Sequence, residues 1–476
     1  MRSRRLPVQL TAAAFPTWRP LDYFHHEILH VSKKEGSRAR VGRLHTPHGT
    51  VETPGFVVVG TNGAVKFVDH HQATAAGMEL MFANTLHLVL HPGTHALQQA
   101  GGLHKLMRRE HKPLITDSGG FQIFSFANRG KDAMPGEGAP AGYTNVGAAD
   151  GGQPAESEEE FDDDFETRGG DGSYYASLGS DKAMQPPPLP PPPPPPPPQP
   201  VELKSARPAG ARNKYAKFEA LSAAVSLTEE GARFRSYRDG SIVTLTPEST
   251  VSAQKVIGAD IIIPLDDLPA AGTGLEELKR SVARTHRWEA RSLLEHVADR
   301  RQQAMYGIIH GGTNLDLRLQ SVELLSTLPF DGFALGGSLG RTRAEMFEML
   351  EHVMPALPTH KPNHLLGIGD EESLRRCVAL GIDTFDSSYP TRMGRHGNLL
   401  TRQGVVKVGK AIYRNDHGPV DPECDGLVST QYSRAYLHHL VRAHEPVVHG
   451  LCTLHNIKFM ADLMKALREQ IWRNEI

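Results

Sequence analysis

Four aspartates are the residues of this chain best suited to chemistry, and each lies at or near the end of a short apolar run: Asp117, Asp266, Asp267 and Asp386. One such aspartate would most simply be a helix N-cap or a turn residue. A set that recurs run after run indicates a site instead. Paired carboxylates suit cleavage of a glycosidic bond with retention, in which one attacks the sugar carbon and the other acts as acid and then as base.

Other polar residues and glycines end the same runs: Asn84, Ser118, Gly119, Gly120, His310, Gly311, Gly312, Gly336 and Gly337. Glycines allow backbone N–H groups to come close to a ligand. We expect these residues to line a pocket for a planar base.

The elements that would position these residues alternate along the chain. The apolar runs are 79–85, 114–117, 261–267, 305–311, 332–337, 365–369 and 383–387, and helical patterns occupy 275–298, 315–328, 343–357 and 371–380. Apolar strands that alternate with helices predict a parallel sheet covered on both faces. Because nearly every run ends in its own polar group, a (β/α)8 TIM barrel fits better than an open doubly wound sheet, which would gather its functional residues at one switch point.

A segment of different composition interrupts this pattern at 128–225. It is rich in glycine and acids and contains nine consecutive prolines at 190–198. Such a composition predicts a disordered insertion with a polyproline II stretch, and a docking site for proline-reading domains is the alternative. The barrel is then expected at 37–127 and 226–415, with a C-terminal subdomain at 416–476.

The charge and cysteine content indicate which partners and which cellular compartment fit the chain. The net charge is −2, but segment 128–225 holds 9 Lys and Arg against 15 Asp and Glu, so the rest is mildly basic and permits an RNA partner. Three widely spaced cysteines argue for a reducing compartment, and no apolar run is long enough to span a bilayer. Residues 1–36 read as a basic tail or an organellar transit peptide, so the expected location is cytoplasmic, with a mitochondrial or other organellar one as alternative.

Four motifs identify a family. They are TDSGGFQ at 116–122, GIDTFD at 381–386, PTR at 390–392 and YSRAYLHHL at 432–440. In combination they resemble the tRNA-guanine transglycosylases, or queuine tRNA-ribosyltransferases, from about Arg40 to Leu467 apart from the insertion. The resemblance implies a (β/α)8 barrel that exchanges the wobble guanine of tRNAs with a GUN anticodon for queuine or a related 7-deazaguanine.

The resemblance also implies roles for single residues. Asp386 matches the nucleophile that attacks ribose C1′, and Asp117 the group that accepts protons from the base. The matching base-binding residues are Asn84, Ser118, Phe121, Asp266, His310, Gly336 and Gly337. Arg392 and Arg395 lie where the family meets the tRNA backbone.

The chain departs from the family at a zinc site and in the pocket. The family binds zinc through a Cys-x-Cys-x2-Cys cluster and a distant His, whereas the matching positions here are Cys424, Gly426, Ser429 and His455. Two of four ligands remain, so we expect well under one zinc per chain and no certain cofactor. In the pocket, His310, Ser338 and Leu86 replace the usual Gln, Leu and Tyr, and Arg341 falls near a usual Glu, which predicts an altered base preference.

Two other functions compete with that of a catalytic transglycosylase. The resemblance implies a homodimer or a heterodimer with a paralogous subunit, and this chain could be the non-catalytic member of such a pair. The presence of both Asp117 and Asp386 argues against that role. The second competing function is that of an unrelated barrel hydrolase acting on nucleosides. Arg392 and Arg395 argue against it.

Overall fold

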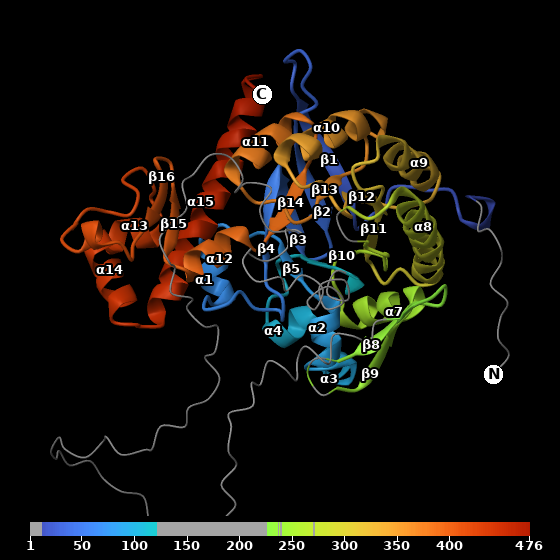
Figure 1. The fold of residues 1–476 in the computed structure, drawn as a ribbon, viewed down its shortest axis with the longest axis horizontal. Coiled ribbons are helices and arrows are strands. Elements are labelled where there is room, and N and C mark those ends of the chain that lie inside the picture. The colour runs from blue at the N-terminus through green and yellow to red at the C-terminus, as the bar shows by residue number, and fades with distance from the viewer. Residues whose placement is uncertain (1–11, 121–225, 237, 239, 270–271) are drawn as a thin grey trace, which may run out of the picture. The chain divides into compact units, whose positions relative to one another are not determined.

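The computed structural model describes residues 12–120, 226–236, 238, 240–269 and 272–476. Its centre is a closed barrel of eight parallel strands (Figure 1). In chain order they are β4 (Gly55–Val59), β5 (Met81–Ala83), β6 (Leu114–Thr116), β10 (Ile261–Ile262), β11 (Ala304–Ile309), β12 (Gly332–Leu335), β13 (Asn363–Leu365) and β14 (Thr384–Ser387). The predicted TIM barrel is confirmed, and the open doubly wound sheet is excluded.

Helices surround this barrel, as Figure 1 shows. They are α1 (His70–Ala75), α2 (Thr85–Leu90), α3 (Thr94–Ala100), α4 (Leu103–Met107), α7 (Pro247–Ile257), α8 (Leu275–Ala298), α9 (Leu315–Ser326), α10 (Arg343–Val353) and α11 (Glu371–Ala379). Side chains cap several N-termini: Asn314 caps α9 and Asp370 caps α11. Because helices cover the outside and side chains fill the inside, every residue of β11 and β12 is buried.

The segment before the barrel packs against it. Strands β1 (His25–Val31), β2 (Arg40–Thr46) and β3 (Gly49–Thr53) form an antiparallel sheet, preceded by the short helix η1 (Ala12–Ala14). Trp18 Nε1 donates to Asp331 Oδ1 at 3.2 Å, and Phe15 is buried in the main core. Much of the segment predicted to be a tail, from Phe15 onward, therefore contacts the barrel, while residues 1–11 lie outside the described ranges.

The C-terminal part begins directly after the last barrel strand. It contains α12 (Tyr389–Arg395), β15 (Asn398–Thr401), β16 (Gly404–Lys407), η3 (Ala411–Tyr413), α13 (Leu427–Gln431), α14 (Arg434–Arg442) and α15 (Val447–Trp472). Helix α15 packs on α12 and on β4. The two helices approach closely at Gly394, where an added Cβ would lie 2.6 Å from the Thr453 backbone.

The remaining elements are short, and part of the chain is not described. A sheet of β7 (Ser226–Leu227), β8 (Ala232–Arg235) and β9 (Ile242–Leu245) precedes α7, and η2 (Met354–Ala356) follows α10. The insertion expected at 128–225 lies outside the described residues. Within the described ranges, no helix combines the length and apolar character that a bilayer crossing requires.

Two buried histidines of α8 predict how stability depends on pH. Burial lowers the pKa of His286 to about 4 and that of His296 to about 3. The unfolded chain has histidine pKa values near 6.5, so it binds more protons than the native state between pH 6.5 and 4. Both groups therefore stabilise the fold fully above pH 6.5, and this contribution is lost as the pH falls towards 4.

We expect the free energy of unfolding to fall by roughly a few kcal/mol over that range, as measured by urea unfolding at pH 7, 6, 5 and 4.5. His286 Nε2 lies 3.0 Å from Ser321 Oγ, and in His286→Gln an amide can keep this contact without titrating. The variant should therefore show a shallower pH dependence. An identical slope in the two proteins would contradict the assignment to His286.

Candidate active site

Asp117 and Asn84 meet at the C-terminal ends of neighbouring strands. Asp117 follows β6 and Asn84 follows β5, so both side chains emerge at the same end of the barrel. Asn84 Nδ2 donates to Asp117 Oδ2 at 2.7 Å, and the Thr85 backbone N–H donates to Oδ1 at 2.7 Å. Neutral donors thus hold both carboxylate oxygens in place, which suits a group that must exchange protons with a ligand from a fixed position.

Asp266 and His310 form a second contact of predicted site residues. His310 Nε2 donates to Asp266 Oδ2 at 3.0 Å, across the ends of β10 and β11. An added Cβ at Gly120 would lie 2.5 Å from Asp266 Oδ1, and one at Gly337 would lie 2.8 Å from His310 Nδ1. Gly337 also has φ +73°, which other residues rarely adopt. The glycines at these strand ends are therefore required for the approach of backbone to the Asp266–His310 pair.

A fully buried arginine holds the loops that carry this pair. Arg318 of α9 is 0% exposed, and its guanidinium donates to the carbonyl oxygens of Ile309, Gly312, Gly336 and Ser338. Four carbonyls satisfy a charge that would be costly to bury unpaired. Because these carbonyls belong to the ends of β11 and β12, Arg318 fixes the positions of His310 and the predicted base-binding Gly336 and Gly337 together.

Strand β10 is only two residues long. Side chains from the flanking helices make the hydrogen bonds that neighbouring strand backbone would otherwise make. Gln254 of α7 accepts from the Ile263 N–H at 3.0 Å and donates to the Ile263 carbonyl at 2.9 Å. On the other side, Glu289 of α8 accepts from the Ile308 N–H of β11 at 2.6 Å. The chain after β10 can then leave the sheet and carry Asp266 into the site.

Glu289 is expected to be a neutral acid. Its burial, with the nearby Asp266 carboxylate, raises the pKa of Glu289 well above the usual value, although the Ile308 N–H acts in the opposite direction. Glu289 therefore serves the fold by accepting from β11, and the carboxylate that reaches the barrel end is that of Asp266.

Asp267, the fourth acid of the predicted set, is tied to α8. Its carboxylate pairs with the Arg284 guanidinium at 2.5 Å, and its backbone N–H donates to Thr285 Oγ1 at 3.0 Å. Burial raises the pKa of Asp267 despite Arg284. Asp267 therefore supports the loop that positions Asp266.

Asp386 lies in β14, with β4 and β5 between this strand and β6. Its Oδ1 accepts from His364 Nε2 and from the Gly367 N–H, both at 3.2 Å. Within the described ranges, Oδ2 has no hydrogen-bond donor. One oxygen is thus anchored and the other is available to a substrate. The sequence did not mark His364 as a site residue, because it stands just before an apolar run and belongs to none of the motifs.

The other predicted residues differ in how the structure places them. Ser118 is buried, and its Oγ accepts from the Gly120 N–H at 3.3 Å. Arg392 and Arg395 lie on α12, within ten residues of Asp386 and directly after its strand. Phe121 lies outside the described residues.

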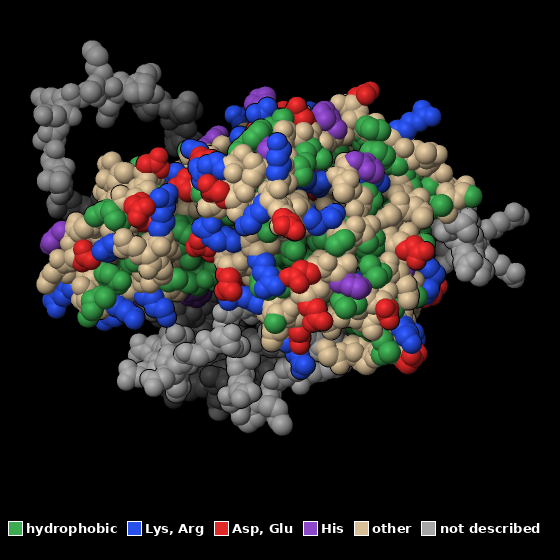
Figure 2. All heavy atoms as spheres, turned by 90° about the horizontal axis from the view of Figure 1, so that it is seen from above, with side chains coloured by type: hydrophobic (Ala, Val, Ile, Leu, Met, Phe, Trp, Pro, Cys, Tyr) green, Lys and Arg blue, Asp and Glu red, His purple; other side chains and the backbone are tan. Residues whose placement is uncertain are grey.

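On the face drawn in Figure 2, Lys and Arg side chains are interspersed with Asp and Glu, so this face has no patch of one sign.

The positions that match the family's zinc ligands come together but do not fit the metal. Ser429 Oγ lies 3.4 Å from His455 Nδ1, and the Gly426 N–H donates to Cys424 Sγ at 3.4 Å. His455 Nε2 donates to the Leu400 carbonyl at 2.8 Å, so Nδ1 carries the lone pair that faces Ser429. A hydroxyl–imidazole hydrogen bond occupies the place where a metal would join the two residues. One thiol and one imidazole do not make a closed four-ligand zinc site.

Neighbouring residues do not complete the ligand set. Cys452 is fully buried, and burial raises the pKa of its thiol to about 12. The Asp421 carboxylate accepts from the N–H groups of Arg402 and Glu423 at 3.1 and 3.0 Å. Asp425 pairs with Lys458 at 2.6 Å.

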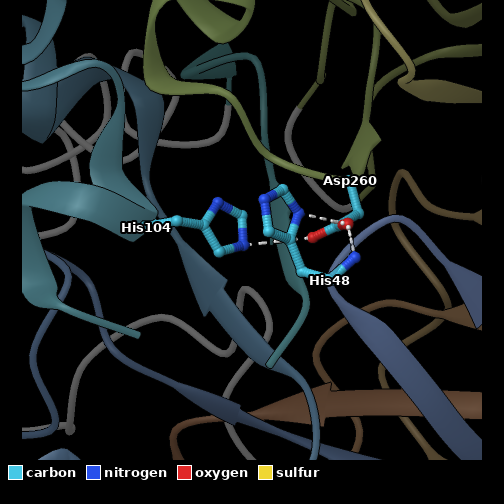
Figure 3. Close-up of side chains that lie close together, drawn as sticks. All are labelled: His48, His104 and Asp260. Carbon is cyan, nitrogen blue, oxygen red and sulfur yellow. Dashed lines mark hydrogen bonds and ion pairs between the residues drawn. The ribbon is translucent and has the colours of Figure 1, made fainter. Parts of the chain in front are cut away.

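Another cluster with metal-ligand chemistry lies at the opposite end of the barrel, where Asp260 immediately precedes β10 (Figure 3). Asp260 Oδ1 accepts from His48 Nδ1 at 2.8 Å, and Oδ2 lies 3.2 Å from His104 Nε2 and accepts from the Leu114 N–H at 2.8 Å. Burial alone would raise the pKa of Asp260, but the two imidazoles outweigh it and hold that pKa below its ordinary range.

The rings of His48 and His104 are stacked, with centroids 3.6 Å apart and planes 11° from parallel. Two parallel rings cannot both direct in-plane lone pairs at one ion, and the Asp260 oxygens already have donors. We therefore interpret the cluster as a set of structural contacts that holds the β2–β3 turn, α4 and β6 together, not as a metal site.

The chain is similar over nearly its whole length to one family of known enzymes. The family model for queuine tRNA-ribosyltransferase matches residues 35–136 and 212–476. The queuine tRNA-ribosyltransferase of Protochlamydia amoebophila is 44% identical over 451 residues, covering 95% of this chain and 96% of the relative. Those of Chlamydia abortus and Chlamydia felis are 41% and 40% identical over 454 residues, covering 95% of this chain and 99% of each relative. The chain therefore belongs to the queuine tRNA-ribosyltransferase family, and it is a pentosyltransferase that modifies tRNA.

Proposed function

We propose that this enzyme exchanges the wobble guanine of GUN-anticodon tRNAs for queuine or a related 7-deazaguanine, through a covalent bond between Asp386 and the ribose. The observation that carries the proposal is the asymmetry of Asp386. Its Oδ1 is held by His364 and Gly367, while Oδ2 has no donor among the described residues. A carboxylate with one anchored and one available oxygen suits a nucleophile that must approach an oxocarbenium-like carbon in a fixed orientation.

The proposed reaction balances in two displacements. Asp386 Oδ2 bonds to ribose C1′ as the bond from C1′ to the guanine nitrogen breaks, and the leaving purine takes up one proton from Asp117. The incoming base then gives up its proton to Asp117, bonds to C1′ and returns the electron pair of the ester bond to Asp386. One proton is gained and one lost, so the exchange needs no net acid or base.

Base recognition is assigned to the side of the barrel end that lies opposite Asp386. Asp266 and His310 present a carboxylate and an imidazole joined at 3.0 Å, which can pair with the amidine edge and the carbonyl of a guanine-like base. Asn84, Ser118, Gly336 and Gly337 complete the proposed pocket, and Phe121 is proposed to stack on the base. Extracting a base from its stack costs about a few kcal/mol, which stacking and hydrogen bonds can offset.

The tRNA backbone is proposed to bind at Arg392 and Arg395. Both lie on α12, within ten residues of Asp386, so a phosphate held there would be close to the nucleotide under attack. As a partner we propose a second copy or a paralogous subunit, and as a location the cytoplasm. The paired Asn84–Asp117 and His364–Asp386 contacts favour a catalytic chain over a non-catalytic accessory subunit.

The test is exchange of radiolabelled guanine into a GUN-anticodon tRNA by the purified chain, alone and with a candidate paralogous subunit. A matched tRNA with cytosine at the wobble position is the control. Incorporation into the first tRNA alone is expected. Incorporation that depends entirely on the partner, and that persists when both Asp117 and Asp386 are replaced in this chain, would identify the accessory role.

A further inference from the structure

We propose that His364 is a positioning residue for the nucleophile. Its imidazole donates from Nε2 to Oδ1 of Asp386, which directs Oδ2 towards the sugar. The inference rests on the proposed role of Asp386, and it assigns a function to a residue that lies outside the motifs of the sequence.

The strand register places this imidazole beside the nucleophile. His364 of β13 is paired with Thr384 of β14, and Asp386 is two residues further along β14, so Thr384 and Asp386 point to the same face. His364 Nδ1 lies 2.9 Å from Thr384 Oγ1, and Nε2 lies 3.2 Å from Asp386 Oδ1. The ring is 0% exposed, so neither contact is shared with bulk water.

Thr384 determines which nitrogen of His364 carries the proton. Its hydroxyl can donate to Nδ1, which then needs a lone pair and leaves the hydrogen on Nε2. The opposite tautomer would turn the Nε2 lone pair towards the Asp386 carboxylate, which is repulsive. Thr384 is 1% exposed, so its hydroxyl has little water to compete for it.

The donor to Oδ1 matters most when the ester breaks. In the covalent intermediate Oδ1 is the carbonyl oxygen, and it regains negative charge as the bond from Oδ2 to C1′ breaks and the incoming base bonds to C1′. A hydrogen bond from Nε2 stabilises that developing charge. Loss of the donor should therefore slow release of the tRNA from Asp386 and let the covalent adduct accumulate.

The first test removes the donor with His364→Phe. We expect kcat for guanine exchange to fall on the order of 10²-fold, a loss typical of removing one such donor. The KM for the free base should change little, because the base-reading Asp266 and His310 lie at the ends of β10 and β11, not on β13. His364→Gln places an amide donor in the same space and should recover most of kcat.

The second test uses a pair of variants that leaves His364 in place. Thr384→Val removes the hydroxyl at nearly constant volume, whereas Thr384→Ser retains it. Thr384→Val should lower kcat about tenfold, an estimate on the same basis, and Thr384→Ser should stay near wild type. In the His364→Phe background, Thr384→Val should have no further effect, because the hydroxyl acts through the imidazole.

These experiments separate the inference from the function it rests on. If wild type forms no covalent adduct with tRNA, the role of Asp386 fails. If wild type forms the adduct but His364→Phe exchanges guanine at the wild-type kcat, the role of His364 fails while that of Asp386 stands. Equal kcat values for Thr384→Val and Thr384→Ser would also overturn the role of His364. This comparison can be made even if His364→Phe does not fold.

Discussion

Asp386→Asn is expected to abolish base exchange, by on the order of 10⁴-fold or more, and to abolish the covalent complex with tRNA. An amide is a poor nucleophile at carbon. The substitution is otherwise conservative, because asparagine Oδ1 can still accept from His364 Nε2 and from the Gly367 N–H, which anchor the aspartate at 3.2 Å. The loss should therefore be chemical, with little change in the melting temperature.

The measurement is denaturing electrophoresis of enzyme mixed with labelled tRNA, together with guanine incorporation. Asp316→Asn is a matched control, since Asp316 is an exposed residue of α9 without catalytic assignment. It should retain full exchange and form the adduct. A tRNA adduct trapped by Asp386→Asn would show that another residue is the nucleophile.

The second large effect concerns zinc. Purified wild-type protein is expected to hold well under one zinc per chain, because the Ser429–His455 hydrogen bond and Gly426 stand where a closed site needs thiolates. The double variant Gly426→Cys, Ser429→Cys is expected to bind about one zinc. Added to Cys424 and His455, the new thiols give four ligands at positions that already lie together.

The local geometry favours this gain of metal binding. Gly426 has φ −68°, so any residue fits the backbone there, and an added Cβ would lie 3.2 Å from Cys424 Sγ. The closer neighbour, Lys458 Cγ at 2.8 Å, must shift to admit the new Cβ. A metal that binds the native state stabilises it by about 4 kcal/mol when its free concentration exceeds Kd a thousandfold. The melting temperature should therefore rise by several degrees and fall again with chelator.

Metal analysis of protein purified without chelator, combined with thermal unfolding, measures both effects. Each single cysteine variant should bind zinc weakly, and His455→Ala in the double variant should reverse the gain. Stoichiometric zinc in the wild type, lost together with stability on Cys424→Ser, would refute the prediction. A double variant that folds but takes up no zinc would show that these four positions do not form a common site.

The sequence by itself determined the architecture, and it predicted which acids lie at one end of the barrel. Buried parallel strands are apolar on both faces and amphipathic helices separate them, so the alternation of runs predicted the barrel that the structure confirms. The C-terminal ends of parallel strands must meet on one face. For this reason Asp117, Asp266 and Asp386 could be expected at one end of the barrel before any contact was known.

Only the tertiary structure decided which side chains support that site. His364, Glu289 and Arg318 looked like ordinary strand or helix residues, because periodicity gives the face of an element but not the atom that the face meets. Strand register placed His364 beside Thr384, and the departure of β10 from the sheet brought Glu289 to the Ile308 N–H. These contacts join residues 19 or more positions apart, and such distances are set by packing rather than by local pattern. The same holds at the positions that match the family's zinc ligands, where folding, not composition, brought Ser429 to His455.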